Sequence, residues 1–139
     1  MRTRGFSIIE LLVVVAIIAL LASLGFASFN IARTKARDAR RVQDMKELQK
    51  ALAQYIVNTG VFPIAVSSTT LTGTDSVSTA LIAAETIPVI SKDPLYPNPS
   101  QSYYTYRSDA NGGIYWISFC METNSLPPYT IGCGNTIAP

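Results

Sequence analysis

An uninterrupted apolar run near the N-terminus constrains this chain more than any other feature. Residues 11–32 contain no charged side chain and consist mostly of Leu, Val, Ile and Ala. As a helix, such a run crosses the ~30 Å hydrocarbon core of a bilayer, which takes about 20 apolar residues. A helix that is apolar on every side needs lipid, or other copies of itself, to cover it. In a chain of 139 residues, the remainder suffices for one modest domain.

The segment that follows the apolar run is basic. Residues 33–50 hold seven Lys or Arg and three acidic residues, whereas residues 51–139 hold two basic and five acidic ones. A basic stretch can be a nucleic-acid arm, a patch for lipid headgroups or one solvated face of a helix. Acidic residues interrupt this stretch at helical spacing, which favours the solvated helix face over DNA binding.

Beyond residue 32 the apolar pattern narrows to a single stripe. Apolar residues recur at three- and four-residue steps, which is typical of an amphipathic helix: Val42, Met45, Leu48, Leu52, Tyr55 and Ile56. Asp44 is expected on the remaining surface, and Asp38 with Arg41 is expected to form an ion pair contributing ~0.2–0.5 kcal/mol. No proline interrupts residues 6–62, and Asn-Thr-Gly at 58–60 is a typical helix end. The sequence predicts one helix over about residues 6–58.

The C-terminal part predicts a small antiparallel sheet, and so an α+β fold. Residues 67–79 hold nine Ser or Thr and are interpreted as a polar loop. Residues 76–86 fit a short helix. Residues 102–107 and 114–122 fit two strands joined by a Gly-rich turn, which together predict a hairpin. A third short strand is expected around residues 129–133.

The aromatic residues of these strands are expected to pack against the helix. Tyr104, Tyr106, Tyr115 and Trp116 form the relevant set. A stripe that binds glycan or single-stranded DNA is the lesser alternative.

The chain lacks the residues of several kinds of chemistry. It has no histidine, the commonest general base and metal ligand. It has no Gly-rich phosphate loop, metal cluster or nucleophile elbow, so no catalysis, cofactor or metal site is expected. Asp109 and Glu122 are expected to be surface carboxylates. In an exported domain, Cys120 and Cys133 would form a disulfide worth about 3 kcal/mol.

The residues before the apolar run indicate which kind of membrane segment the run forms. The chain begins Met-Arg-Thr-Arg-Gly, and Phe6-Ser-Ile-Ile-Glu10 follows. An ordinary signal peptide cut after residue 27, or an uncut signal anchor, fits the basic start and the apolar run. Glu10 fits neither, because a carboxylate at the edge of a span costs up to about 2–3 kcal/mol and usually has a partner. We expect that partner from outside the helix, and an α-amino group created by cleavage before Phe6 is suitable.

The stretch from Gly5 to Val14 resembles the N-terminal motif of type IV prepilins and type II secretion pseudopilins. In that family a prepilin peptidase cuts after the glycine and methylates the new N-terminus, and a glutamate at mature position five pairs with the N-terminal amine during docking. The resemblance implies cleavage between Gly5 and Phe6, N-methylation of Phe6, and a role for Glu10 in assembly and register.

Other stretches also resemble the family, though the match is less specific. They are Glu47-Leu48, Leu52 to Tyr55, Gly60 to Pro63, Asp93-Pro94 and Tyr103 to Tyr106. The calcium site of some major pseudopilins does not map onto this C-terminus. The pair Cys120 and Cys133 departs from the plain pseudopilin pattern and is similar to pilins with a C-terminal disulfide loop.

The resemblance implies a type IV pilin-like fold with four parts. These are a leader peptide (1–5), a transmembrane and assembly half of the long helix (6–32), its amphipathic half (33–60) and a small globular domain (61–139). The function implied is a structural, non-enzymatic subunit of a type IV pilus-like filament, either a surface pilus or a secretion pseudopilus. The alternative is a secreted or membrane-anchored binding module with an ordinary signal peptide.

The resemblance also implies a location and partners. The chain would cross the cytoplasmic (inner) membrane once and then enter an extracellular or periplasmic filament. Its partners would be copies of itself, related pilins, the prepilin peptidase, an inner-membrane assembly platform and membrane lipid. The charges on either side of the span favour the opposite orientation in the membrane. Two arginines precede the span and five basic residues follow closely, which by the positive-inside rule favours an outside N-terminus.

Overall fold

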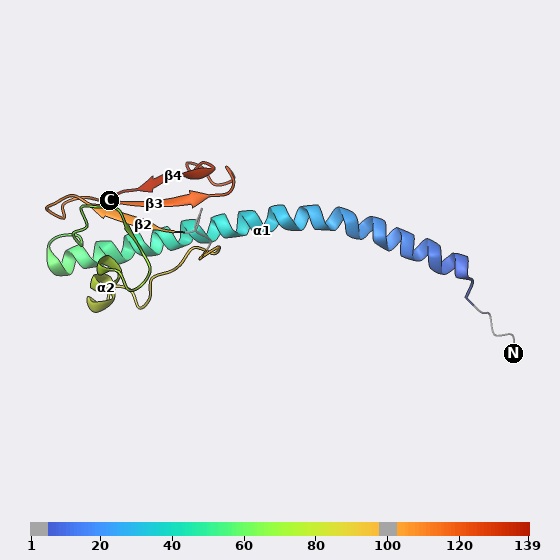
Figure 1. Cartoon of the computed structure of the whole chain (residues 1–139), viewed down its shortest axis with the longest axis horizontal. Coiled ribbons are helices and arrows are strands. Elements are labelled where there is room, and N and C mark those ends of the chain that lie inside the picture. Colours follow the sequence, from blue (N-terminus) through green and yellow to red (C-terminus); the bar gives the residue numbers. More distant parts are fainter. Residues whose placement is uncertain (1–5, 98–102) are drawn as a thin grey trace. The chain divides into compact units, whose positions relative to one another are not determined.

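One helix of 52 residues runs through more than a third of the chain. In the computed structural model, which describes residues 6–97 and 103–139 without the side chains of 24–27, helix α1 extends over Ile8–Thr59 (Figure 1). The predicted helix is confirmed to within two residues at each end. The amide of Gly60 donates to the carbonyl of Ile56 over 2.8 Å, and the positive φ of Gly60 (83°) turns the chain away. The contacts divide the chain into two compact units, Met1–Thr34 and Lys35–Pro139, and both contain part of α1.

In the first unit, no described side chain of α1 is packed. All described side chains from residue 6 to residue 33 are exposed. The large apolar side chains among them remain between 46% (Val14) and 80% (Ile8) exposed. Within the described ranges, α1 is the one helix long and apolar enough to cross a membrane, and its most apolar stretch has no cover. The first half of α1 therefore requires an apolar environment from outside the chain.

The second unit contains a four-stranded antiparallel sheet in the order β1-β2-β3-β4. The strands are β1 (Thr69–Thr70), β2 (Thr105–Ser108), β3 (Tyr115–Met121) and β4 (Gly132–Ile137). The α+β class and the β2–β3 hairpin are confirmed. β4 starts later than the expected third strand because the residues before it form a turn, in which the amide of Tyr129 donates to Leu126. β1 lies inside the segment that the sequence predicted to be a loop.

A short helix, α2 (Ser76–Ala83), begins where the sequence predicted and ends three residues earlier. Its N-cap is Asp75, whose carboxylate accepts the amide of Ser78 over 2.9 Å. The helix ends at Ala84, where backbone amides turn back to the carbonyls of Ala80 and Ile82. Two of its apolar residues, Val77 and Leu81, are 1% exposed and belong to the core.

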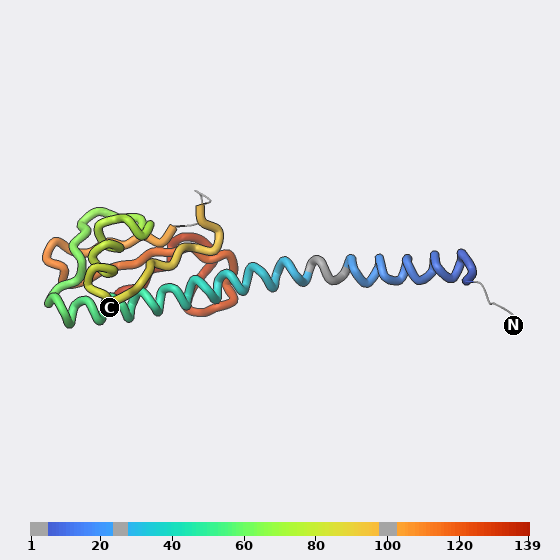
Figure 2. Tube along the Cα trace, turned by 90° about the horizontal axis from the view of Figure 1, so that it is seen from below, coloured from blue at the N-terminus to red at the C-terminus, as the bar shows by residue number. Residues whose placement is uncertain are grey.

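The core of the second unit lies between the sheet and the amphipathic part of α1 (Figure 1). Every second residue of β3 is buried, which is the pattern of a strand with one face covered. These residues, with Tyr104 and Tyr106 at 1% exposed, pack with Met45, Leu48 and Leu52 of α1. The packing role predicted for Tyr104, Tyr106 and Tyr115 is confirmed, whereas the same prediction for Trp116 is wrong, because Trp116 is half-buried and lies outside this core. Figure 2 shows residues 60–97, in green to yellow, beside the strands, and their apolar residues complete the same core.

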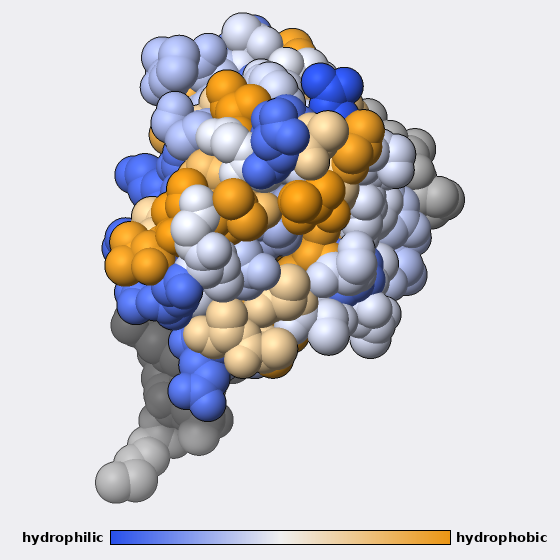
Figure 3. Space-filling view, turned by 90° about the vertical axis from the view of Figure 1, so that its left-hand side faces the viewer, coloured by the Kyte–Doolittle hydropathy of each residue, from blue (hydrophilic) through white to orange (hydrophobic). Residues whose placement is uncertain are grey.

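The end of the second unit where α1 stops carries apolar side chains on its surface. Figure 3 shows them gathered among polar ones on this face. Val57, Val61 and Ile64, near the end of α1, are 81%, 41% and 57% exposed. The turn after β2 sits against this segment, because the amide of Phe62 donates to the carbonyl of Gly112 over 2.8 Å. A Cβ at Gly112 would lie 2.6 Å from the carbonyl oxygen of Phe62, so glycine is required there.

Candidate functional site

The first candidate region is the N-terminal turn of α1. Ser7 precedes the helix, and its Oγ accepts the amide of Ile9 over 3.4 Å. In return, Oε2 of Glu10 accepts the amide of Ser7 over 3.0 Å. These two hydrogen bonds cap the helix in a way similar to a capping box, and they satisfy amides that the first turn otherwise leaves without partners. A carboxylate also interacts favourably with the positive end of the helix dipole.

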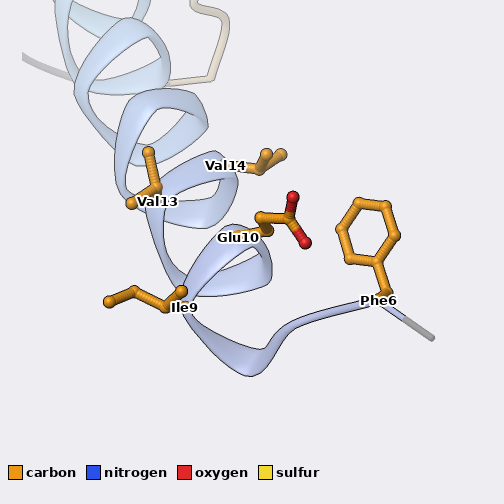
Figure 4. Close-up of a pocket in the computed structure, with 5 residues that line it drawn as sticks. All are labelled: Phe6, Ile9, Glu10, Val13 and Val14. Atoms are coloured by element: carbon orange, nitrogen blue, oxygen red, sulfur yellow. The ribbon is translucent and has the colours of Figure 1, made fainter. Parts of the chain in front are cut away.

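Phe6 and Glu10 lie together at this turn. A shallow hollow of about 420 Å³ is lined by Phe6, Ile9, Glu10, Val13 and Val14. Figure 4 shows the Glu10 carboxylate between the Phe6 ring and the helix. Phe6 is 77% exposed, and Glu10 is exposed as well. The two residues are therefore accessible to a partner from outside the chain.

This geometry changes one expectation about Glu10. Its partner was expected from outside the helix, whereas in this structure the carboxylate accepts the amide of Ser7 in its own first turn. The pattern Ser-x-x-Glu before an apolar run is the sequence signal for this cap. Gly5 lies outside the described residues. The cleavage, methylation and assembly roles of Gly5, Phe6 and Glu10 remain predictions.

The second candidate region is an ionic cluster in the globular unit, centred on Arg41. The Arg41 side chain is 0% exposed. Its guanidinium donates to Asp38 over 2.8 Å, to Asp93 over 2.7 and 3.1 Å, and to Glu122 over 2.7 Å. Arg37 also binds Glu122, with Nε 2.8 Å from Oε1. These five side chains are called the Arg41 cluster below.

The carboxylates of the Arg41 cluster also bind the backbone of other segments. Asp38 accepts the amides of Glu122 (3.0 Å) and Thr123 (2.8 Å), just after β3. Asp93 accepts the amide of Leu95 over 2.8 Å. The cluster thus joins α1, the connection between α2 and β2 that contains Asp93, and the end of β3 through charge-assisted hydrogen bonds.

The pKa values in this part of the molecule follow from burial and from these partners. Burial lowers the pKa of Arg41, but the hydrogen bonds to Asp93, Glu122 and Asp38 outweigh it, so the pKa is raised. The hydrogen bond from Arg37 lowers the pKa of Glu122. Both shifts favour the charged forms of Arg41 and Glu122, which are hydrogen-bonded to each other over 2.7 Å.

Several charged groups are less exposed than predicted. The predicted Asp38–Arg41 ion pair forms over 2.8 Å, but both side chains are 0% exposed, and Glu122 is half-buried and binds two arginines. Asp44 is 4% exposed and accepts the Tyr104 hydroxyl over 2.7 Å. The physical reason is the same in each case: partners 52 to 85 residues away satisfy the charge, so it can be buried. Helical spacing within 33–50 carries no information about such distant partners.

The two cysteines meet across the last hairpin. Cys120 of β3 and Cys133 of β4 form a disulfide over a sequence separation of 13. No group of three or more Asp, Glu, Cys or His side chains in the described ranges is placed to hold a metal ion. The carboxylates of the Arg41 cluster instead surround a guanidinium.

The chain matches known proteins both at its N-terminus and over most of its length. Residues 1–26 match the family described as the prokaryotic N-terminal methylation motif. Over 110 residues the chain is 32% identical to type II secretion system core protein G of Escherichia coli (strain K12). The aligned region covers 79% of this chain and 66% of that protein, just under two thirds of its length. No solved structure matches the chain significantly.

These matches agree with the structure. The methylation motif includes the Phe6–Glu10 turn, and a long apolar helix leads into a small antiparallel sheet. An N-terminal apolar helix without cover fits a membrane-anchored subunit. The N-terminal motif and the relative together support the assignment of the chain to the type IV pilin and pseudopilin family.

Proposed function

We propose that this protein is a structural subunit of a type IV pilus-like filament, assembled through the first half of α1. The observation that carries the proposal is the exposure of every described side chain between residues 6 and 33, directly behind a methylation motif. In the membrane, lipid covers this surface. In a filament, the same surface of neighbouring subunits covers it, so the helix exchanges one apolar environment for another.

The Phe6–Glu10 turn would serve processing and docking. A prepilin peptidase would cut between Gly5 and Phe6 and methylate the new amine of Phe6. Glu10 would then pair with the N-terminal amine of a neighbouring subunit and so set the register of docking. A carboxylate accepts at both oxygens. Oε1 can therefore receive the neighbour's ammonium while Oε2 keeps the amide of Ser7.

The proposed location and partners follow from this assembly route. The precursor would cross the inner membrane once through the first half of α1, with lipid around it and an inner-membrane assembly platform beside it. The filament of copies and related pilins would then extend into the periplasm or beyond the cell. The relative whose name assigns it to a type II secretion system favours a secretion pseudopilus over a surface pilus.

The N-terminus of the mature chain tests the processing step. Intact mass and N-terminal fragment spectra of protein purified from its own membranes should show a chain that starts at N-methylated Phe6. A chain starting at Ser28 would identify an ordinary signal peptide, and an uncut Met1 would identify a signal anchor. Either result would replace the filament proposal with a secreted or membrane-anchored binding module.

Substitution of Glu10 tests the docking step. Glu10→Ala should strongly reduce filament assembly while membrane insertion continues, because the neighbour's ammonium loses its only designated acceptor. The measurement is the ratio of sheared filaments to membrane-bound subunit. Glu47→Ala, which removes an exposed carboxylate from the same helix, is the matched control and should assemble normally. Normal filaments from Glu10→Ala would contradict the docking role.

A further inference from the structure

The face of the sheet turned away from α1 has an unusual composition. Cross-strand partners point to the same face of a sheet. The register pairs Thr70 with Thr105, Thr105 with Ser118, and Ser118 with Thr136. One lateral row of four hydroxyl side chains therefore crosses all four strands. On the opposite face, Tyr106, Ile117 and Phe119 are buried in the core.

The next row on this outer face holds a cation and an aromatic ring. Arg107 of β2 pairs with Trp116 of β3, and its guanidinium lies 4.9 Å from the centre of the indole ring. A hollow of about 260 Å³ lies between this pair and the hydroxyl row, lined by Ser68, Arg107, Trp116, Ser118 and Thr136. A second hollow of about 140 Å³ shares Ser118 and continues toward Tyr103 and the Cys120–Cys133 disulfide.

The charge on this surface is positive and isolated. None of the residues in the four strands is acidic, and Arg107 is the only basic one. Arg107 takes part in none of the ion pairs found among the described residues. Apart from its contact with Trp116, the planar guanidinium of Arg107 therefore remains available to bind an anion through two hydrogen bonds.

We propose that this outer face of the sheet binds an acidic saccharide, a sugar unit that carries a carboxylate or a sulfate. Arg107 would pair with the anionic group, and the exposed part of Trp116 would pack against the apolar face of the sugar ring. Ser68, Ser118 and Thr136 would exchange hydrogen bonds with the sugar hydroxyls, because a hydroxyl both donates and accepts. The assignment does not depend on filament assembly.

The observations favour a saccharide over single-stranded nucleic acid. A groove for single-stranded DNA combines stacking rings with several cations that follow the phosphates. This face has one cation and a row of neutral hydroxyls. The hollow of about 260 Å³ is also slightly below the ~300–1,000 Å³ typical of pockets for drug-sized ligands, so it suits about one sugar unit.

Trp116 makes the test specific, because it is the only tryptophan in the chain. Full-length protein in detergent micelles is titrated with a galacturonic acid trisaccharide while tryptophan fluorescence is recorded. The fully methyl-esterified trisaccharide is the matched neutral probe, and an oligothymidylate is the nucleic-acid probe. The acidic trisaccharide should give a saturable change, and the ester should bind about tenfold more weakly, a difference of 1.4 kcal/mol.

Two variants and one control separate the site from non-specific effects. Arg107→Gln should weaken binding of the acidic trisaccharide about tenfold and equalise the acid and its ester. Thr136→Val should weaken both probes alike. Lys92→Gln is the control, because Lys92 also lies over an aromatic ring, 4.7 Å from the centre of Tyr96. This variant should bind the acidic trisaccharide as tightly as the unchanged protein. Circular dichroism checks that each variant is folded.

Three results would overturn the proposal. The first is the absence of a saturable fluorescence change with the acidic trisaccharide. The second is equal binding of the acid and the ester to the unchanged protein, which would remove the role of Arg107. The third is tighter binding of the oligothymidylate than of the trisaccharide, which would assign the face to nucleic acid instead.

Discussion

Arg41 shows how a single residue can connect the whole globular unit. Taking a guanidinium out of water costs several kcal/mol, and only good geometry with partners of opposite charge offsets this cost. Arg41 has such partners in α1, in the connection before β2 and at the end of β3. Its contribution is therefore measured best by what its removal leaves behind, which is buried carboxylates without their cation.

We expect Arg41→Ala to destabilise the globular unit by ~3–5 kcal/mol, because Asp38 and Asp93 stay buried and lose their cation. The measurement is urea unfolding of the full-length protein in detergent, followed by circular dichroism. Arg40→Ala is the matched control. Arg40 is exposed, so the change there should stay within ~0.5 kcal/mol. A loss below about 1 kcal/mol in Arg41→Ala would mean that water reaches the cluster.

The environments of individual charged residues were also the hardest feature to predict from the sequence. Asp38, Arg41 and Glu122 look like solvated charges in a local window of the sequence, because such a window leaves out their distant partners. Their burial depends on pairs separated by up to 85 residues, which no local period encodes. The Phe6–Glu10 turn was missed although its signal is local. Its Ser-x-x-Glu pattern indicates a cap within the first turn, whereas the partner of Glu10 was expected from outside the helix.

At the scale of elements, local patterns were sufficient for α1 and for the β2–β3 hairpin. The long helix follows from an apolar run, a stripe and a Gly stop, all within one segment. β1 could not be predicted in this way, because Thr69 and Thr70 become a strand only by pairing with Tyr106 and Thr105. The late start of β4 follows from the turn before it, where the side chain of Asn135 binds the amide and the carbonyl of Thr130.

The last hairpin, formed by β3 and β4, contains the disulfide. The disulfide between Cys120 and Cys133 closes a short loop, for which the chain-entropy model gives about 3 kcal/mol. Reduction of the wild-type protein should therefore lower its unfolding midpoint in urea clearly. The double variant Cys120→Ser, Cys133→Ser should match the reduced wild type and should not respond to reductant. If reduction left the midpoint unchanged, β4 would be held by its ladder and core contacts alone.

At the scale of the whole molecule, the two units differ in what stabilises them. The globular unit contains its own core, an ionic cluster and a disulfide, and it includes the amphipathic part of α1. The first unit has no packed side chain among its described residues before Thr34, so its stability depends on lipid or on other subunits. This division follows the change from all-round apolar sequence to a single stripe.

Residues 35–139 should therefore form a soluble, folded monomer when exported without the first unit. Removal of the exposed apolar surface leaves a unit with a complete core. Size-exclusion chromatography and cooperative thermal unfolding measure this directly. The same region with Met45→Asp, which places a charge at a side chain that is 0% exposed, is the control and should fail to fold. Aggregation of the unaltered region would show that the first unit contributes to the fold.

The continuity of α1 has a mechanical consequence. If an assembly machine extracts the subunit from the membrane by its first helix half, the load enters the globular unit along α1. Beyond Thr34, the first contacts to carry the load are those of Arg37, Asp38 and Arg41. Each of these residues is hydrogen-bonded to a segment distant in sequence. These hydrogen bonds share the load and must break together. The helix therefore cannot be pulled from the globular unit one contact at a time.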